Sequence, residues 1–179
     1  MVMKRIILVA LAASTLAACE TGGPNVGPAP PSGPAYIPPS GGNEAFRDSD
    51  FAWSTASGSG AIDGVLAYNG PGGRYTCSDV ILAPETPWSR ARMRILYLST
   101  TQAAMPVDDV KARTPPEHST DYARYARKAS CDANGDFSFT GLPNGSWYVI
   151  TVATPANGTR MAVMRRVTTN GGTVRVTLR

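Results

Sequence analysis

The stretch from Cys131 to Val152 constrains the fold more than any other part of this sequence. Between residues 136 and 140, polar and aromatic side chains alternate, which is typical of an extended strand with one buried face. Residues 147–152 are almost wholly apolar or β-branched, as in a central strand. Asn-Gly pairs at 134–135 and 144–145 accept the positive φ angles of tight hairpin turns. The stretch therefore predicts paired antiparallel strands.

The same turn signal recurs along the chain, at 69–70, 134–135, 144–145, 157–158 and 170–171. Its spacing is typical of an antiparallel β-sandwich. We expect strands at about 61–68, 79–83, 92–98, 128–132, 136–140, 146–154, 160–168 and 172–178. In the last of these, the apolar Val176 and Leu178 face the core while Arg175 faces water. The adjacent Arg165 and Arg166 point to opposite faces, so one of them needs a rim position, a bulge or a partner.

The stretch after Cys131 resembles the core of the carboxypeptidase regulatory-like domain, which has a transthyretin-like (prealbumin-like) fold. The matching residues are Asp132, Gly135, Phe137, Phe139, Leu142, Pro143, Gly145 and Tyr148. The resemblance covers residues 61–154, and the segment 99–128 departs from it. It implies an all-β fold, an antiparallel β-sandwich of seven to eight strands, here with one short inserted helix. It also implies a binding or structural role and not catalysis.

The first residues are typical of a bacterial lipoprotein signal peptide, residues 1–18. Lys4 and Arg5 precede an apolar run that is shorter than the roughly 20 residues of a membrane-spanning helix. The run ends in the letters LAAC, which resemble the lipobox, so cleavage would leave Cys19 as the palmitate-bearing N-terminus. Glu20 follows in place of aspartate, which favours the outer membrane. The alternative is an ordinary secretory signal with an incidental cysteine.

Residues 19–58 are predicted to be a lipid-anchored, disordered linker that leads to a β-sandwich domain at 59–179. Gly, Pro, Ser and Ala dominate the linker. Such a composition cannot bury enough apolar surface to offset the entropy of ordering the chain. Phe46, Phe51 and Trp53 interrupt the pattern. The sequence leaves three alternatives for these aromatic residues: they dock on the sandwich, they form a partner-binding peptide, or they have no role.

The chain has three cysteines. Lipidation of Cys19 would leave Cys77 and Cys131 as a pair, and an exported chain permits a disulfide. We therefore expect a Cys77–Cys131 bond, and the alternative is two buried free thiols. Because no Cys-x-x-Cys motif or histidine cluster accompanies them, neither a metal nor another cofactor is expected.

The strand pattern lapses between residues 99 and 128. Residues 120–128 predict a short helix, in which Thr120 caps the start and Tyr122 and Tyr125 lie on one face. This helix packs over a sheet edge or, alternatively, forms the lip of a ligand site.

The formal net charge is +4, and the basic excess lies in the globular part because the linker is acidic. Arg90, Arg92 and Arg94 alternate, so we expect them to line one sheet face. They contact an anionic envelope polymer or form a solvated face. Trp88, expected in a loop, stacks on a sugar ring or covers the rim of the core. Nucleic acid is not expected as a partner of an exported lipoprotein.

No catalytic centre is evident in the sequence. His118 is the single histidine, and nothing near it would orient it for a Ser-His-Asp or Cys-His site. Asp132, Asn134 and Asp136 superficially suggest a calcium loop. However, the glycine stands at the fourth place and no glutamate stands at the twelfth, so a turn explains these residues better. We therefore expect a protein that is not an enzyme.

Together these features favour a non-catalytic outer-membrane lipoprotein whose domain lies in the periplasm or at the cell surface. The tethered sandwich would contact an envelope protein or polysaccharide. The alternative is a carbohydrate- or peptidoglycan-binding module that uses Trp88, Arg90, Arg92 and Arg94. Trp147, in the central strand, is expected in the core.

Overall fold

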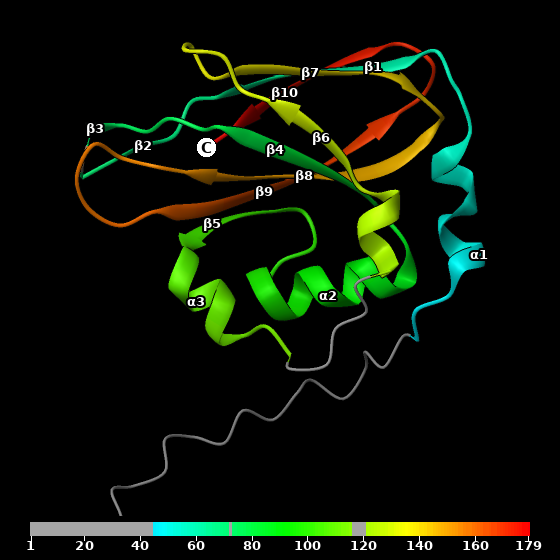
Figure 1. Cartoon of the computed structure of the whole chain (residues 1–179), viewed down its shortest axis with the longest axis horizontal. Coiled ribbons are helices and arrows are strands. Elements are labelled where there is room, and N and C mark those ends of the chain that lie inside the picture. The colour runs from blue at the N-terminus through cyan, green and yellow to red at the C-terminus, as the bar shows by residue number, and fades with distance from the viewer. Residues whose placement is uncertain (1–44, 72, 116–120) are drawn as a thin grey trace, which may run out of the picture. The chain divides into compact units, whose positions relative to one another are not determined.

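The structure is a computed structural model and describes residues 45–71, 73–115 and 121–179. Two β-sheets pack face to face, and helices cover the outer side of the larger sheet (Figure 1). Contacts divide the chain into residues 1–37 and 38–179, and every described residue belongs to the second unit. The predicted signal peptide, Cys19 and His118 lie outside the described residues. Within the described ranges, no helix is long and apolar enough to cross a membrane.

The elements follow each other in the order shown by the colours of Figure 1. They are α1 Asp48–Phe51, the 3-10 helix η1 Ala52–Thr55, β1 Gly60–Leu66, β2 Asn69–Gly70, β3 Gly73–Arg74, β4 Asp79–Pro84, α2 Pro87–Tyr97, β5 Gln102–Pro106, α3 Val107–Ala112, the 3-10 helix η2 Asp121–Tyr125, β6 Arg127–Ser130, β7 Asp136–Leu142, β8 Gly145–Ala153, β9 Met161–Thr169 and β10 Thr173–Leu178. The predicted strands are confirmed within a few residues, except for the one at 92–98.

The larger sheet has the strand order β5-β9-β8-β4-β6, and the smaller one has the order β10-β1-β7. Every neighbouring pair in them is antiparallel except β1 and β10, which run parallel, with Ala61 opposite Thr173 and Leu66 opposite Leu178. The expectation of a wholly antiparallel sandwich is therefore wrong at this pair. The reason is that the chain leaves the larger sheet after β9 and enters the smaller one in the direction of β1.

Four of the five Asn-Gly pairs lie at the connections between strands, whereas Asn69 and Gly70 form the short strand β2, and three of the four do not close hairpins. The pairs at 134–135, 144–145 and 170–171 carry the chain from one sheet to the other. Gly135 and Gly171 have φ angles of 86° and 91°, as such turns require. A turn signal fixes where the chain reverses, whereas the apolar face of each strand decides which sheet it joins.

The main core lies between the two sheets. Phe137 and Phe139 of β7 are buried while Ser138 between them is exposed, which confirms the predicted alternation. Trp147 of β8 is fully buried, as expected, and Leu178 of β10 is too. These side chains fill the space between the sheets together with Ile62, Leu66, Val80, Leu82, Leu142, Val149, Val163 and Val176.

Helix α2 replaces the strand predicted at 92–98 and packs on the outer face of the larger sheet (Figure 1). Thr86 caps it: the side chain of Thr86 accepts from the Ser89 backbone N–H, the side chain of Ser89 accepts from the Thr86 N–H, and Pro87 starts the first turn. Met93, Leu96 and Tyr97 are buried at helical spacing. The alternating arginines gave the strand prediction, but the cap and the apolar stripe decide the outcome.

The segment between residues 99 and 128 also differs from the prediction. It contributes the edge strand β5, which pairs with β9, and helix α3. In place of a helix over 120–128, η2 ends at Tyr125 and β6 begins at Arg127, where it pairs with β4. Thr120, the expected cap, lies outside the described residues. Pairing with β4 therefore outweighs the helical pattern in the second half of this segment.

Cys77 and Cys131 form a disulfide, as predicted, with their Cα atoms 5.7 Å apart. Cys77 lies just before β4 and Cys131 just after β6, so the bond joins the ends of two paired strands. It thereby closes a loop that contains α2, β5, α3 and η2.

The arm formed by residues 45–55, predicted as the end of the linker, docks on the domain through its aromatic residues. Phe51 is 1% exposed and stacks on Tyr125 with ring centroids 4.9 Å apart. Trp53 meets the buried Trp147 edge to face at 4.9 Å. Asp48 accepts hydrogen bonds from Arg124 and from the Tyr125 hydroxyl, and its contact with Arg124 lowers the pKa of the Asp48 carboxyl. Docking is thus the role of these aromatics in the structure.

Candidate functional site

Glu85 is the most deeply placed ion-pairing carboxylate of the described residues, with a side chain only 7% exposed. It stands between the end of β4 and the cap of α2, where its backbone N–H donates to the carbonyl of Ser146 at 2.8 Å. Its Oε1 accepts from the Tyr148 hydroxyl at 3.1 Å and pairs with Arg90 at 2.7 Å. Its Oε2 accepts from Arg166 Nε at 2.6 Å. Glu85 therefore ties α2 to two strands of the larger sheet.

Arg166 shows how the sheet accommodates two adjacent arginines. Arg166 also donates to the Ser146 hydroxyl at 3.0 Å, on the neighbouring strand β8. Arg165 points to the opposite side, where it donates to the Thr177 carbonyl of β10 at 3.0 Å. Each arginine thus has a partner, which is one of the solutions that the sequence allowed.

Tyr148 is fully buried, and burial raises the pKa of its hydroxyl, with the negative charge of Glu85 as the next cause. The phenol therefore stays protonated and acts as a hydrogen-bond donor to the carboxylate. A buried carboxylate that accepts from a phenol and two guanidinium groups is held in one orientation.

A groove of about 490 Å³ opens above this network, and we call it the Glu85 groove. Its lining residues are Trp53, Glu85, Thr86, Pro87, Arg90, Ala91, Arg94, Gly145 and Ser146. Trp53 forms one wall, and its ring lies against Gly145 so closely that a Cβ there would be 2.2 Å from it. Arg90 is half exposed and Arg94, one helical turn later, is exposed. The groove thus combines an aromatic ring with guanidinium groups on a rigid floor.

The structure does not bring the four sequence-predicted contact residues together. Arg90 and Arg94 line the Glu85 groove, whereas Trp88 and Arg92 line a separate cavity of about 280 Å³ between α2 and the larger sheet. The reason is the helix: residues four apart share a face, and a residue between them does not. The predicted arrangement on one sheet face is therefore wrong.

Trp88 is part of an aromatic cluster and not of an open loop. It lies in the first turn of α2, and its ring contacts Phe46, Phe51 and Tyr122 at centroid distances of 5.5, 6.1 and 5.2 Å. The Arg92 guanidinium lies 5.4 Å from its centroid. Of the two roles expected for Trp88, covering the rim of the core agrees with this geometry.

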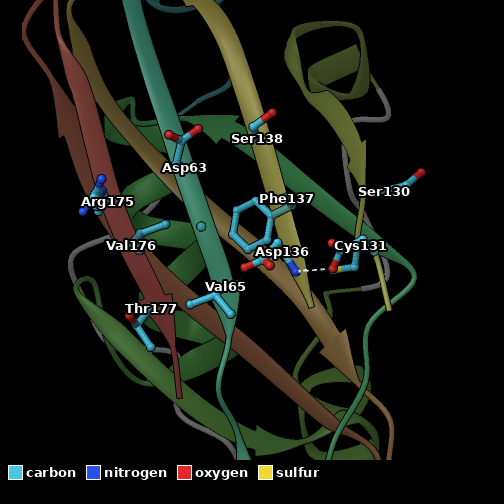
Figure 2. A pocket seen from close by; sticks show the side chains of 12 residues that line it. Asp63, Val65, Ser130, Cys131, Asp136, Phe137, Ser138, Arg175, Val176 and Thr177 are labelled. Atoms are coloured by element: carbon cyan, nitrogen blue, oxygen red, sulfur yellow. Dashed lines mark hydrogen bonds between the residues drawn. The ribbon is translucent and has the colours of Figure 1, made fainter. Parts of the chain in front are cut away.

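A third hollow, of about 730 Å³, lies at the smaller sheet (Figure 2). Asp63, Ser138 and Arg175 stand there on three adjacent strands, with Asp63 opposite both of the others. Asp132 Oδ1 accepts from the backbone N–H groups of Asn134 and Asp136, both at 2.8 Å, so these residues form a turn. Among the described residues, no group of His, Cys, Asp and Glu could hold a metal ion.

Sequence reasoning missed Glu85, Tyr148 and Arg166 as parts of a site, and for Trp53 it left docking, partner binding and no role as alternatives. These residues come from segments far apart in the chain, and Glu85 is separated from Tyr148 by 63 residues and from Arg166 by 81. The one local signal was Thr86-Pro87-x-Ser89 directly after a strand, which marks a helix start.

Comparison with known proteins shows similarity at the level of the fold. No family model matches the chain, and no curated protein matches it in sequence. A solved structure from Pseudomonas aeruginosa, described as a "putative carbohydrate binding protein", aligns with a TM-score of 0.55 and 24% sequence identity. The alignment covers 74% of this chain and 96% of that one. At this identity the likeness shows the fold and nothing more.

Proposed function

We propose that this chain is a non-catalytic envelope lipoprotein whose transthyretin-like sandwich binds a glycan in the Glu85 groove. The observation that carries the proposal is the rigid network at the groove floor, where Glu85 holds Tyr148, Arg166 and Arg90, beside the wall formed by Trp53. Small-molecule sites typically combine a small number of polar groups, held in a fixed arrangement, with an aromatic side chain.

A sugar ring suits this combination of groups. One face of a pyranose is a patch of C–H bonds, which packs on an aromatic ring, while its hydroxyl groups project around the edge and take hydrogen bonds from planar polar side chains. Trp53 offers the ring, and Arg90 and Arg94 offer the planar donors. The description of the Pseudomonas aeruginosa neighbour gives weak additional support for this class of ligand.

Binding without cleavage agrees with the carboxylate count of the groove. Glycoside hydrolysis usually needs two carboxyl groups on opposite sides of the scissile bond. Among the described residues that line the groove, Glu85 is the only carboxylate, and both of its oxygens already have partners. Glu85 is therefore suited to holding the floor of the groove and not to acid–base chemistry.

Replacing Trp53 by Ala is expected to weaken glycan binding about tenfold, because the C–H face of the sugar loses the indole on which it packs, and an aromatic contact contributes about 0.5–1.5 kcal/mol beyond the area that it buries. Affinity is measured by calorimetry against a panel of neutral and acidic oligosaccharides. Trp88→Ala is the matched control, since it removes an indole on the other side of α2. Equal loss in both variants, or no loss in Trp53→Ala, would count against the groove.

The proposed anchor has a separate test. Cys19→Ala is expected to abolish palmitate labelling and to move the protein from the membrane fraction to the soluble fraction, since stable attachment needs two or more acyl chains. Cys77→Ser in the same assay controls for the loss of a cysteine. Labelling that persists without Cys19 would refute the lipid anchor and leave the glycan site untouched.

A further inference from the structure

The polar groups of the Glu85 groove are mostly occupied before any ligand arrives. Glu85 Oε1 accepts from the Tyr148 hydroxyl and pairs with Arg90, and Oε2 accepts from Arg166. With these partners in place, the carboxylate has little capacity left for sugar hydroxyl donors. A ligand therefore finds no strong acceptor on the floor of the groove.

The hydroxyl groups that border the groove also have hydrogen-bond partners within the protein. The Thr86 hydroxyl accepts from the Ser89 backbone N–H in the helix cap, at 3.1 Å. The Ser146 hydroxyl accepts from Arg166 and is within 2.9 Å of the Thr168 hydroxyl. What remains for a ligand is the set of N–H groups on Arg90 and Arg94, which are donors only.

The charge of the groove has the same sign as these donors. Two arginines, Arg90 and Arg94, and one carboxylate, Glu85, line the groove, and Arg166 pairs with the same carboxylate. Glu85 is shared by Arg90 and Arg166, and no ion pair is found for Arg94 within the described ranges. The groove thus carries an excess of positive charge that a neutral sugar would leave uncompensated.

We propose that the ligand of the Glu85 groove is a carboxylated glycan, such as a uronic-acid oligomer, and that Arg94 with Arg90 binds its carboxylate. The inference rests on the proposed glycan-binding function and narrows it to one ligand class. A guanidinium fork matches a carboxylate in shape and can donate two parallel hydrogen bonds to it. Because Arg90 and Arg94 lie four residues apart on α2, their side chains flank one stretch of the groove.

The test uses oligomers of galacturonic, glucuronic and mannuronic acid, each paired with its own carboxyl-reduced, neutral form. Calorimetry on the full-length protein is expected to show binding of at least one acid oligomer and at least about tenfold weaker binding of its reduced form, the loss expected for a charge-assisted hydrogen bond. Affinity for the acid form should fall as salt rises from about 50 to about 500 mM, because salt screens exposed charges.

Variants separate the groove from the general basic charge of the protein. Arg94→Gln is expected to lower affinity for the acid oligomer about tenfold and to leave any binding of the reduced form unchanged. Arg175→Gln is the matched control: it removes the same charge from the exposed face of the smaller sheet and should change neither affinity. An equal loss in both variants would overturn the assignment to Arg94.

The outcomes distinguish this inference from the function beneath it. Equal affinity for an acid oligomer and its reduced form overturns the carboxylate inference while glycan binding stands. Binding of neutral sugars without binding of any acid oligomer also overturns the carboxylate inference and leaves glycan binding in place. Binding of no member of the panel, neutral or acidic, overturns both.

Discussion

Replacing Cys77 and Cys131 together by Ser is expected to lower the free energy of unfolding by about 4 kcal/mol. The two residues are separated by 54 positions, and in the reduced chain this long loop is free to explore many more conformations when unfolded. The loss is measured by urea denaturation of the double variant and of the wild type. Reduction of the wild-type protein should reproduce it.

The neighbouring serines provide the control for this pair of substitutions. Ser78→Ala with Ser130→Ala changes two exposed hydroxyls beside the cysteines and leaves the cross-link in place, so its effect should stay within about 0.5 kcal/mol. A loss below about 1 kcal/mol in the cysteine variant would show that the unfolded chain is already compact in this region.

Glu85→Ala is expected to destabilise the domain by about 3 kcal/mol, because it leaves the partly buried Arg166 and the fully buried Tyr148 hydroxyl without their acceptor. Arg90 loses an exposed ion pair and contributes little to this value. Glu85→Gln keeps the shape of the side chain and should cost less. Urea denaturation at neutral pH measures both.

Asp63→Ala is a suitable control for Glu85→Ala. It also removes a carboxylate, but from the exposed face of the smaller sheet, so its effect should be within about 0.5 kcal/mol. If Glu85→Ala had as small an effect as Asp63→Ala, the network at the groove floor would not stabilise the domain. The groove would then lack the rigid floor on which the proposed site depends.

Much of the sandwich follows from local patterns. The alternation at Phe137 and Phe139 and the apolar run around Trp147 each predict a strand that is present in the structure. They do so because a strand with a buried face needs apolar residues at regular positions. Helix α2 shows the limit of this logic. Its arginines at 90, 92 and 94 alternate as in a strand, and only the Thr86 cap and the stripe of Met93, Leu96 and Tyr97 indicate the helix.

The candidate site was less accessible to prediction than the fold. Glu85 has no unusual local context beyond its place before a helix cap, and its partners Tyr148 and Arg166 lie on strands far along the chain. Trp53 comes from a segment whose composition resembles a linker. A network of this kind depends on the packing of α2 against the larger sheet, which no local pattern encodes.

The parallel pairing of β1 and β10 bears on how the domain can assemble. Ala61 pairs with Thr173, and nearly the whole domain lies between them in the sequence. Pairing over so large a sequence separation slows folding. Until β10 arrives, one side of β1 presents unpaired backbone groups to other chains. We therefore expect the β1–β10 pair to form late in folding and to be a point where an incompletely folded chain can associate with other chains.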